Sequence, residues 1–100
     1  MKVIWTREAL EKLNGIEDFI GINNPERAEI FINYLIEQGE LISQNPKIGR
    51  IGPEILNPEI REIIVKKYRI VYKINKKNII ILTVFEGHRL LRIDELKIKK

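Results

Sequence analysis

The chain has 100 residues, of which 44% are hydrophobic and 32% charged, a composition that suits one folded domain over residues 1–100 and argues against disorder. It contains no cysteine, which excludes disulfides, a thiolate nucleophile and zinc–thiolate sites. The net charge of +4 is unevenly spread, because residues 1–46 hold four basic and eight acidic residues (net −4) and residues 47–100 hold fourteen and six (net +8). A basic half of this kind favours a polyanion or an acidic protein as the partner.

No apolar run approaches the length needed to cross a membrane, and the longest, Ile79–Phe85, has the length of a strand. Glu8 and Glu11 interrupt the first residues, which therefore lack the apolar run of a signal peptide. We expect a soluble, cytoplasmic protein with no membrane partner.

Two amphipathic helices are predicted in the first half of the chain, after a short apolar strand, Lys2–Trp5. Thr6 suits the N-cap of the first helix, Thr6–Gly21, in which apolar residues recur at steps of three and four. An Asn-Pro pair marks the start of the second helix, Pro25–Gln44. Because only about three residues join them, the helices should form an antiparallel hairpin, and we expect Trp5 to pack on the first helix.

A meander of three antiparallel strands is predicted in the second half, after a loop over Pro46–Pro58. The three strands are Arg61–Lys66, Tyr68–Asn75 and Asn78–Glu86. The middle strand alternates, with Tyr68, Ile70, Tyr72 and Ile74 on one face and Arg69, Val71 and Lys73 on the other.

The last of these strands is apolar on both faces, with Ile79, Ile81, Thr83 and Phe85 expected on one side. Such a strand requires cover on both faces of the sheet. The element order predicts an α+β fold in which an N-terminal strand and a helical hairpin precede the sheet and both helices lie on one of its faces. The other face, which carries Arg69, Val71 and Lys73, is expected to stay open for the C-terminal tail or a partner.

Neither a metal site nor a cofactor site is indicated, since the chain has one histidine and lacks a glycine-rich phosphate loop. One group of side chains with chemical potential is a set of cations along the sheet: Arg50, Arg61, Lys66, Lys67, Arg69, Lys73 and Arg89. Clustered arginines can hold a phosphate bidentately, and Arg69 and Arg89 would converge if their strands are neighbours. The alternative is that these cations only line a solvated strand face.

A second group is His88 with Tyr68 and Tyr72, since histidine and tyrosine can act as acid and base. Tyr72 falls on the helix-facing side of its strand, so we favour core packing for this residue. For His88 we favour a role as a polar turn residue.

Several short motifs follow one another in a distinctive order and spacing. They are Trp5 with Ala9 and Leu13, Asn24-Pro25, Asn45-Pro46 before Gly49-Arg50, Ile60-Arg61-Glu62, Tyr68-Arg69-Ile70-Val71-Tyr72, and Gly87-His88-Arg89. Together they resemble the RelE/ParE superfamily of type II toxin–antitoxin toxins, also called plasmid stabilisation proteins, over nearly the whole chain. The resemblance implies two N-terminal helices on an antiparallel sheet, and a growth-inhibiting toxin neutralised by a small antitoxin protein.

The resemblance leaves the target open, because RelE-like members cleave mRNA on the ribosome and ParE-like members inhibit DNA gyrase. Arg69 and Arg89 match two arginines of the RelE-type site, but no tyrosine follows Tyr72, and Glu62 places an acid among the expected cations. The missing tyrosine and the long helical hairpin favour a ParE-like gyrase inhibitor that performs no chemistry. A metal-independent mRNA endonuclease (mRNA interferase), or a non-toxic module that only binds the antitoxin, remains an alternative.

The resemblance also indicates which residues would function in each case. The residues expected to bind the antitoxin or the target are Arg50, Arg69, Val71, Lys73, Arg89, Leu90 and Leu91. The residues expected to be catalytic, if the chain is RelE-like, are Arg61, Arg69, His88 and Arg89, with His88 in place of the missing tyrosine.

Overall fold

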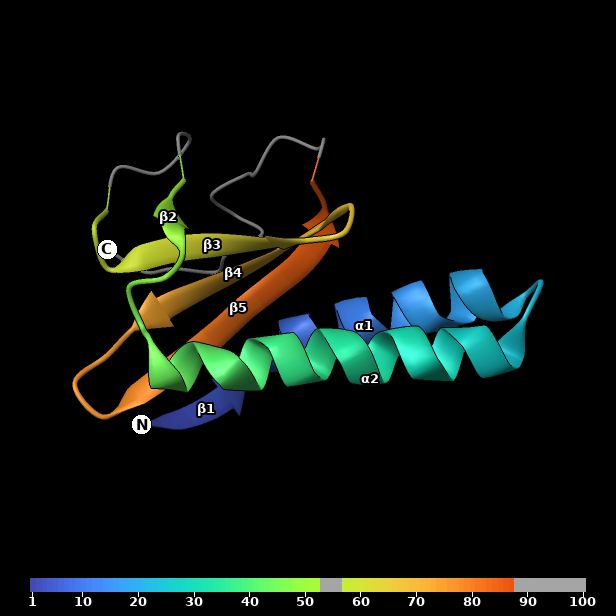
Figure 1. Cartoon of the computed structure of the whole chain (residues 1–100), viewed down its shortest axis with the longest axis horizontal. Helices are drawn as coiled ribbons and strands as arrows, with labels where there is room; N and C mark the ends of the chain where they lie inside the picture. The colour runs from blue at the N-terminus through green and yellow to red at the C-terminus, as the bar shows by residue number, and fades with distance from the viewer. Residues whose placement is uncertain (53–56, 88–100) are drawn as a thin grey trace.

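Five strands form one open sheet in the order β1-β5-β4-β3-β2 in a computed structural model, which describes residues 1–52 and 57–87 (Figure 1). The strands are β1 Lys2–Trp5, β2 Arg50–Ile51, β3 Ile60–Val65, β4 Tyr68–Ile74 and β5 Asn78–Glu86. The helices are α1 Arg7–Gly21, α2 Pro25–Leu41 and the short 3-10 helix η1 Ile42–Gln44. In the described part of the chain, no helix is long and apolar enough to cross a membrane.

The predicted α+β fold is confirmed, with a helical hairpin covering one face of a mostly antiparallel sheet. The helices begin where their caps predict, because the side chains of Thr6 and Asn24 accept hydrogen bonds from backbone N–H groups of the first turns. One detail differs from the prediction, since β1 pairs with β5 in parallel. Parallel neighbours require a long connection, and here it runs through the helical hairpin and strands β2 to β4.

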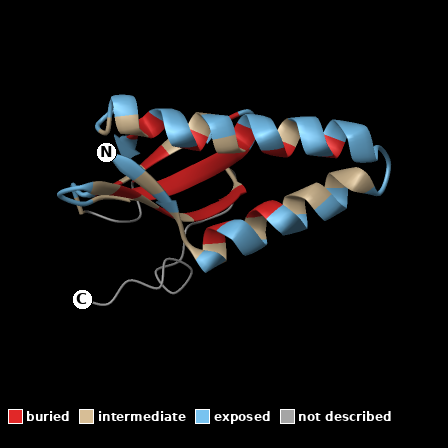
Figure 2. Ribbon diagram, turned by 90° about the horizontal axis from the view of Figure 1, so that it is seen from below, coloured by how far each residue is buried: buried red, intermediate tan, exposed pale blue. Residues whose placement is uncertain are grey.

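The core lies between the helices and the sheet, where the inward sides of both helices are buried (Figure 2). Its fully buried members include Ala9, Leu35, Ile70, Tyr72 and Ile79. The tyrosine-bearing side of β4 therefore faces the helices, as its alternation predicts.

Trp5 packs on α2, a contact that the sequence-based prediction did not include. A Cβ built on Gly39 would lie 2.5 Å from Trp5 Cζ2, so the helix has room for the indole ring only because residue 39 lacks a side chain. The indole Nε1 also donates to Glu40 Oε2 at 3.3 Å. Gly39 has a low helix propensity and weakens the end of α2, but the packing of Trp5 requires a glycine at this position.

A β-bulge in β5 changes which of its side chains share a face. Val71 pairs with Thr83 and Tyr72 pairs with Ile81, so Leu82 is the extra residue. As a result Ile81 and Val84 both belong to the helix-side core, whereas Phe85 belongs to a small cluster on the opposite face. The prediction that Phe85 shares a face with Ile79 and Ile81 is therefore wrong.

Candidate functional site

Arg69 and Glu62 form a buried ion pair on the face of the sheet opposite the helices. Their side chains are 4% and 2% exposed. Arg69 Nη2 donates to Glu62 Oε1 at 2.8 Å, and Arg69 Nε donates to Glu62 Oε2. The guanidinium also lies 5.0 Å from the ring centroid of Phe85, its partner across β4 and β5. Glu62 therefore fills the hydrogen-bonding fork that a bound phosphate would require.

Arg50 of β2 adds a second cation to the same carboxylate. It lies opposite Glu62 across the β2–β3 ladder, and its Nε is 3.3 Å from Glu62 Oε1. The Arg50 side chain is 63% exposed, so it can also meet a partner. The sequence prediction placed Arg50 in the loop before the sheet, whereas the structure places it in β2, and its role in binding remains a proposal.

The centre of this face is buried. Arg69 is 3% exposed and Val71 is 1% exposed. Val71 lies on the central strand and packs in a small cluster with Ile60 and Phe85. Lys73, at the end of β4, is only partly buried. Internal pairing of the Arg69 charge makes its burial tolerable, since a lone buried cation would be costly.

Arg61 lies on the other face, so it does not join Arg69. It is paired with Tyr72 across β3 and β4, and its Nη1 donates to the Gly49 carbonyl at 2.9 Å. The Tyr72 hydroxyl donates to the Pro46 carbonyl at 2.7 Å and accepts from the Gly49 N–H at 2.9 Å. Arg61 and Tyr72 thus fix the segment that leads into β2, and the predicted grouping of Arg61 with the other cations is wrong.

Both tyrosines of β4 are core residues, and for Tyr72 this is the role favoured from the sequence. Burial raises the pKa of Tyr72, although the Gly49 N–H and the Arg61 charge act in the opposite direction. Burial, and then the nearby Glu86 charge, raise the pKa of Tyr68. Neither hydroxyl is therefore prepared to lose a proton near neutral pH.

Four of the residues singled out in the sequence, His88, Arg89, Leu90 and Leu91, lie outside the described residues. The convergence of Arg89 with Arg69 therefore stays a prediction. Among the described residues, no group of three or more His, Asp or Glu side chains could hold a metal ion.

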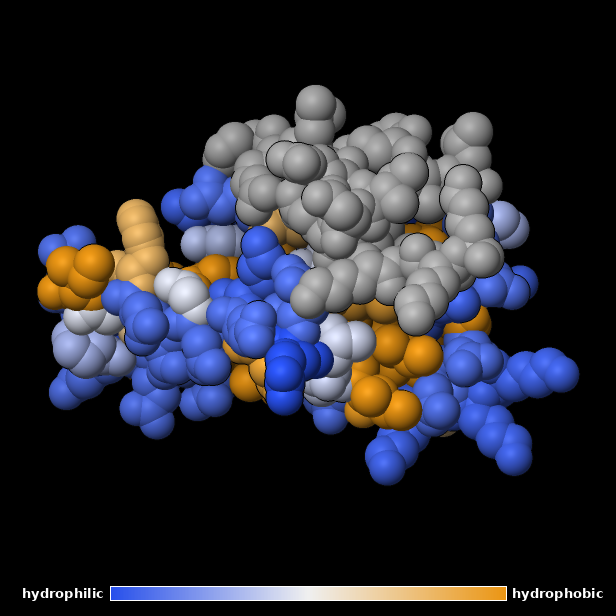
Figure 3. Space-filling model, turned by 180° about the vertical axis from the view of Figure 1, so that it is seen from behind, coloured by the Kyte–Doolittle hydropathy of each residue, from blue (hydrophilic) through white to orange (hydrophobic). Residues whose placement is uncertain are grey.

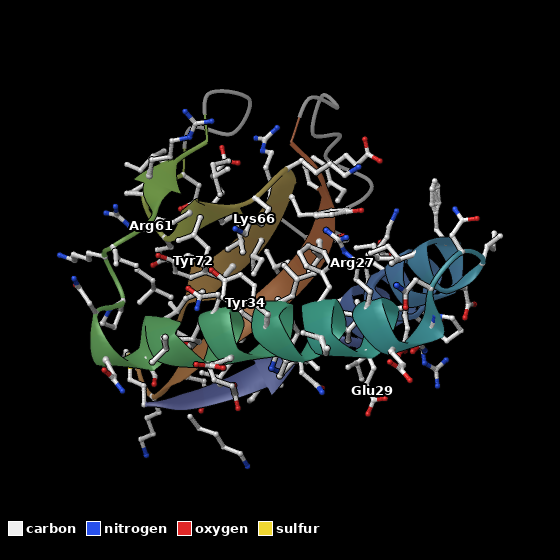
Figure 4. All side chains as sticks on the ribbon, turned by 45° about the vertical axis from the view of Figure 1, so that its right-hand side comes forward. Arg27, Glu29, Tyr34, Arg61, Lys66 and Tyr72 are labelled. Atoms are coloured by element: carbon white, nitrogen blue, oxygen red, sulfur yellow. The ribbon has the colours of Figure 1, made fainter. Side chains whose placement is uncertain are left out.

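A groove runs along α2 in the described part of the chain, and sequence analysis missed it. One end, about 540 Å³, is lined by apolar and cationic side chains, among them Phe31, Tyr68, Arg27, Lys66 and Lys67. The other end, about 470 Å³, is lined by residues of α2 and β3 that include Leu41, Ile48, Ile63 and Ile64. Tyr34 stands between the two ends, with Lys66 Nζ 6.0 Å from its ring centroid (Figure 4). We call this feature the α2–β3 groove.

A signal for the groove exists in the sequence, in a second stripe on the second helix. Arg27, Phe31, Tyr34, Gln38 and Leu41 recur at steps of three and four and lie beside the buried stripe. Sequence analysis did not consider this stripe, in which Tyr34 and Leu41 are 39% and 44% exposed.

Apolar surface also gathers at the turn of the helical hairpin. Phe19 is 64% exposed and Ile22 is 80% exposed. Figure 3 shows this surface at the left-hand end of the molecule, away from the sheet.

Comparison with known proteins connects these features to a family. A family model described as the ParE toxin of the type II toxin–antitoxin system, parDE, matches residues 3–91. Among solved structures, a chain described as the chromosomal ParDE TA system from P. aeruginosa is 25% identical, with a TM-score of 0.72. The match covers 86% of this chain and 95% of that one. None of the curated proteins compared with the chain matches it significantly.

Proposed function

The chain belongs to the family of ParE toxins of type II toxin–antitoxin systems, and on that premise we propose that it arrests growth by binding DNA gyrase in the cytoplasm and is neutralised by a cognate antitoxin. The match over residues 3–91 includes both helices and all five strands, so the proposal concerns the whole fold. In this proposal the chain acts by binding and performs no chemistry on its target.

The Arg69–Glu62 ion pair is the observation that favours this function over mRNA cleavage. A nuclease would require the Arg69 guanidinium to hold the scissile phosphate and to neutralise its charge. Here the Arg69 guanidinium donates two hydrogen bonds to the Glu62 carboxylate, and Arg69 is 3% exposed. Two of the expected catalytic cations, Arg61 and Arg69, also lie on opposite faces of the sheet.

The proposal is tested by inducing the protein in bacteria, alone or together with the product of the reading frame adjacent to its gene. We expect growth to stop in the first case and to continue in the second. Plasmid DNA should lose negative supercoiling while transcripts stay intact. Cut transcripts with unchanged plasmid topology would establish the nuclease, and normal growth without the neighbour would indicate a non-toxic binding module.

A double variant, Glu62→Leu with Arg69→Met, provides a sharper control. It removes the guanidinium without leaving an unpaired buried charge, so the fold should survive. If the toxin acts by binding gyrase, the folded double variant remains toxic. Loss of toxicity with an unchanged circular dichroism spectrum would support the nuclease instead.

A further inference from the structure

A pocket of about 310 Å³ lies between α1 and the sheet, where β4 begins and β5 ends. Its walls include the apolar side chains of Ile16, Phe19 and Val84, and Tyr68 lines it from the sheet. We call this feature the α1–β5 pocket. Its size and its mainly apolar lining are those of a site for a small organic molecule.

Gly15 opens the helix side of this pocket. A glycine inside a helix is destabilising relative to alanine, so a structural reason for it is expected. At Gly39 that reason is packing, because Trp5 occupies the space that a side chain would need. At Gly15 packing gives no reason, since a Cβ built there would meet none of the described residues within 4 Å. The missing side chain at position 15 instead leaves room in the pocket that Gly15 lines.

Tyr68 contributes a buried polar group to the pocket. The residue is 6% exposed, and its ring centroid lies 5.5 Å from that of Phe31. No hydrogen bond joins its hydroxyl to another described residue, whereas the Tyr72 hydroxyl makes two. Polar groups this deeply buried are normally hydrogen-bonded, so the Tyr68 hydroxyl can still accept a hydrogen bond from a ligand and donate one to it.

Two carboxylates make the pocket acidic. Glu11 of α1 and Glu86 of β5 both line it. Burial, and then the Glu86 charge, raise the pKa of Tyr68, which shows that the Glu86 carboxylate acts on the hydroxyl. A ligand group that lies beside this hydroxyl therefore meets negative potential, which favours a cation.

The nearby lysines do not cancel this potential. Lys12 is the only cation among the described residues that line the pocket, and its Nζ lies 3.8 Å from Glu8 Oε2. Lys67 Nζ lies 5.9 Å from the ring centroid of Tyr68, but Lys67 lines the α2–β3 groove and is not part of this pocket.

We propose that the α1–β5 pocket binds a small primary amine in its protonated form, with an apolar body beside Gly15 and the ammonium group at the Tyr68 hydroxyl. The carboxylates of Glu11 and Glu86 specify a cation, and the hydroxyl oxygen specifies one that carries N–H donors. The apolar walls specify the body of the ligand. This inference goes beyond the proposed function, which assigns no small molecule to the protein, and it does not depend on that function.

A set of three matched compounds tests the ligand chemistry on the full chain. The probe is 2-phenylethylamine, compared with the neutral 2-phenylethanol and the anionic phenylacetate. Binding is followed by titration of the ¹⁵N-labelled protein in heteronuclear NMR spectra. We expect the amine to shift the backbone amide signals of Gly15, Ile16 and Val84 with a dissociation constant of about 1 mM or tighter. The other two compounds should bind at least about tenfold more weakly.

Two variants locate the site. Gly15→Leu fills the pocket from the helix and should weaken amine binding at least about tenfold, while the helix is maintained because leucine has the higher helix propensity. Tyr68→Phe keeps the ring that packs on Phe31 and removes only the hydroxyl. It should weaken amine binding at least about fivefold, because the ammonium group loses a hydrogen-bond partner.

A third variant tests the charge. Glu11→Gln removes one carboxylate from the pocket and should weaken amine binding about two- to fivefold. Glu29→Gln makes the same charge change on α2, outside the pocket, and is the matched control. It should leave the dissociation constant within about 1.5-fold of the original value.

Unchanged signals of Gly15, Ile16 and Val84 in the presence of 2-phenylethylamine would overturn the proposal. Equal binding of 2-phenylethanol would overturn the requirement for a cation. Unchanged affinity in folded Gly15→Leu and Tyr68→Phe would place the amine elsewhere on the protein. Growth arrest and gyrase inhibition are measured without the amine, so the proposed function and this inference can fail separately.

Discussion

The carboxylate of Glu62 accepts hydrogen bonds from two nitrogens of Arg69, so the most buried arginine of the sheet is neutralised within the protein. Glu62→Ala leaves that guanidinium buried without its counter-charge. We expect the free energy of unfolding to fall by about 3–5 kcal/mol, measured by urea denaturation.

The Glu62→Leu/Arg69→Met double variant should recover most of that loss, because two apolar side chains replace two charges. A Glu62→Ala loss below about 1 kcal/mol would contradict the burial of the pair and the argument built on it.

Alanine substitutions at two helical glycines should change stability in opposite directions. A Cβ at Gly15 would meet nothing within 4 Å, so Gly15→Ala should stabilise the protein by about 0.5–1 kcal/mol through helix propensity. A Cβ at Gly39 would meet the Trp5 ring at 2.5 Å, so Gly39→Ala should destabilise it by about 1–3 kcal/mol. Thermal unfolding followed by circular dichroism measures both. Equal effects at the two positions would show that Trp5 does not pack as described.

Tyr72→Phe should destabilise the protein by about 1–2 kcal/mol, because the buried Gly49 N–H and the Pro46 carbonyl lose their hydroxyl partner. The same variant should alter the response to alkali. The pKa of Tyr72 is raised in the folded state, so its contribution is present below the ordinary tyrosine pKa of about 10 and is lost as the pH rises through the folded value.

Urea denaturation at increasing pH measures this response. The unaltered protein should lose stability above pH about 10, and Tyr72→Phe should lose less over the same interval. Because the pKa of Tyr68 is raised as well, a smaller loss should persist in the variant. Identical pH dependence in the two proteins would mean that the pKa of Tyr72 is not raised by folding.

The β3–β4 turn contains a lysine in the left-handed region, since Lys66 has φ 57°. Asparagine tolerates this conformation better than lysine, so Lys66→Asn should stabilise the protein by up to about 1 kcal/mol. Lys67→Asn, in the same turn, is the matched control, because Lys67 has no positive φ. A larger gain at Lys67 than at Lys66 would contradict the turn geometry.

Most of the fold could be predicted because its signals are local. Thr6 and Asn24-Pro25 cap helices by chemistry within one turn, and the alternation of Tyr68–Ile74 requires only neighbours in sequence. The two-residue strand β2 and the bulge at Leu82 were missed, because both are defined by pairing with distant strands.

The candidate site was predicted less well, since charge in a sequence does not reveal which residues pair. Glu62 stands among cations in the sequence, and only the β3–β4 register places it beside Arg69. The same register separates Arg61 from Arg69 by placing them on opposite faces. The second stripe of α2 is visible in the sequence, but the position of the α2–β3 groove depends on how the helical hairpin lies on the sheet.

The most direct measurement of the central claim is a supercoiling assay with purified DNA gyrase, titrated with the purified protein. The account predicts that supercoiling is inhibited in proportion to added protein, and that the folded Glu62→Leu/Arg69→Met variant inhibits equally well. Gyrases that stay fully active in its presence, while the same preparation cleaves mRNA on ribosomes, would contradict it.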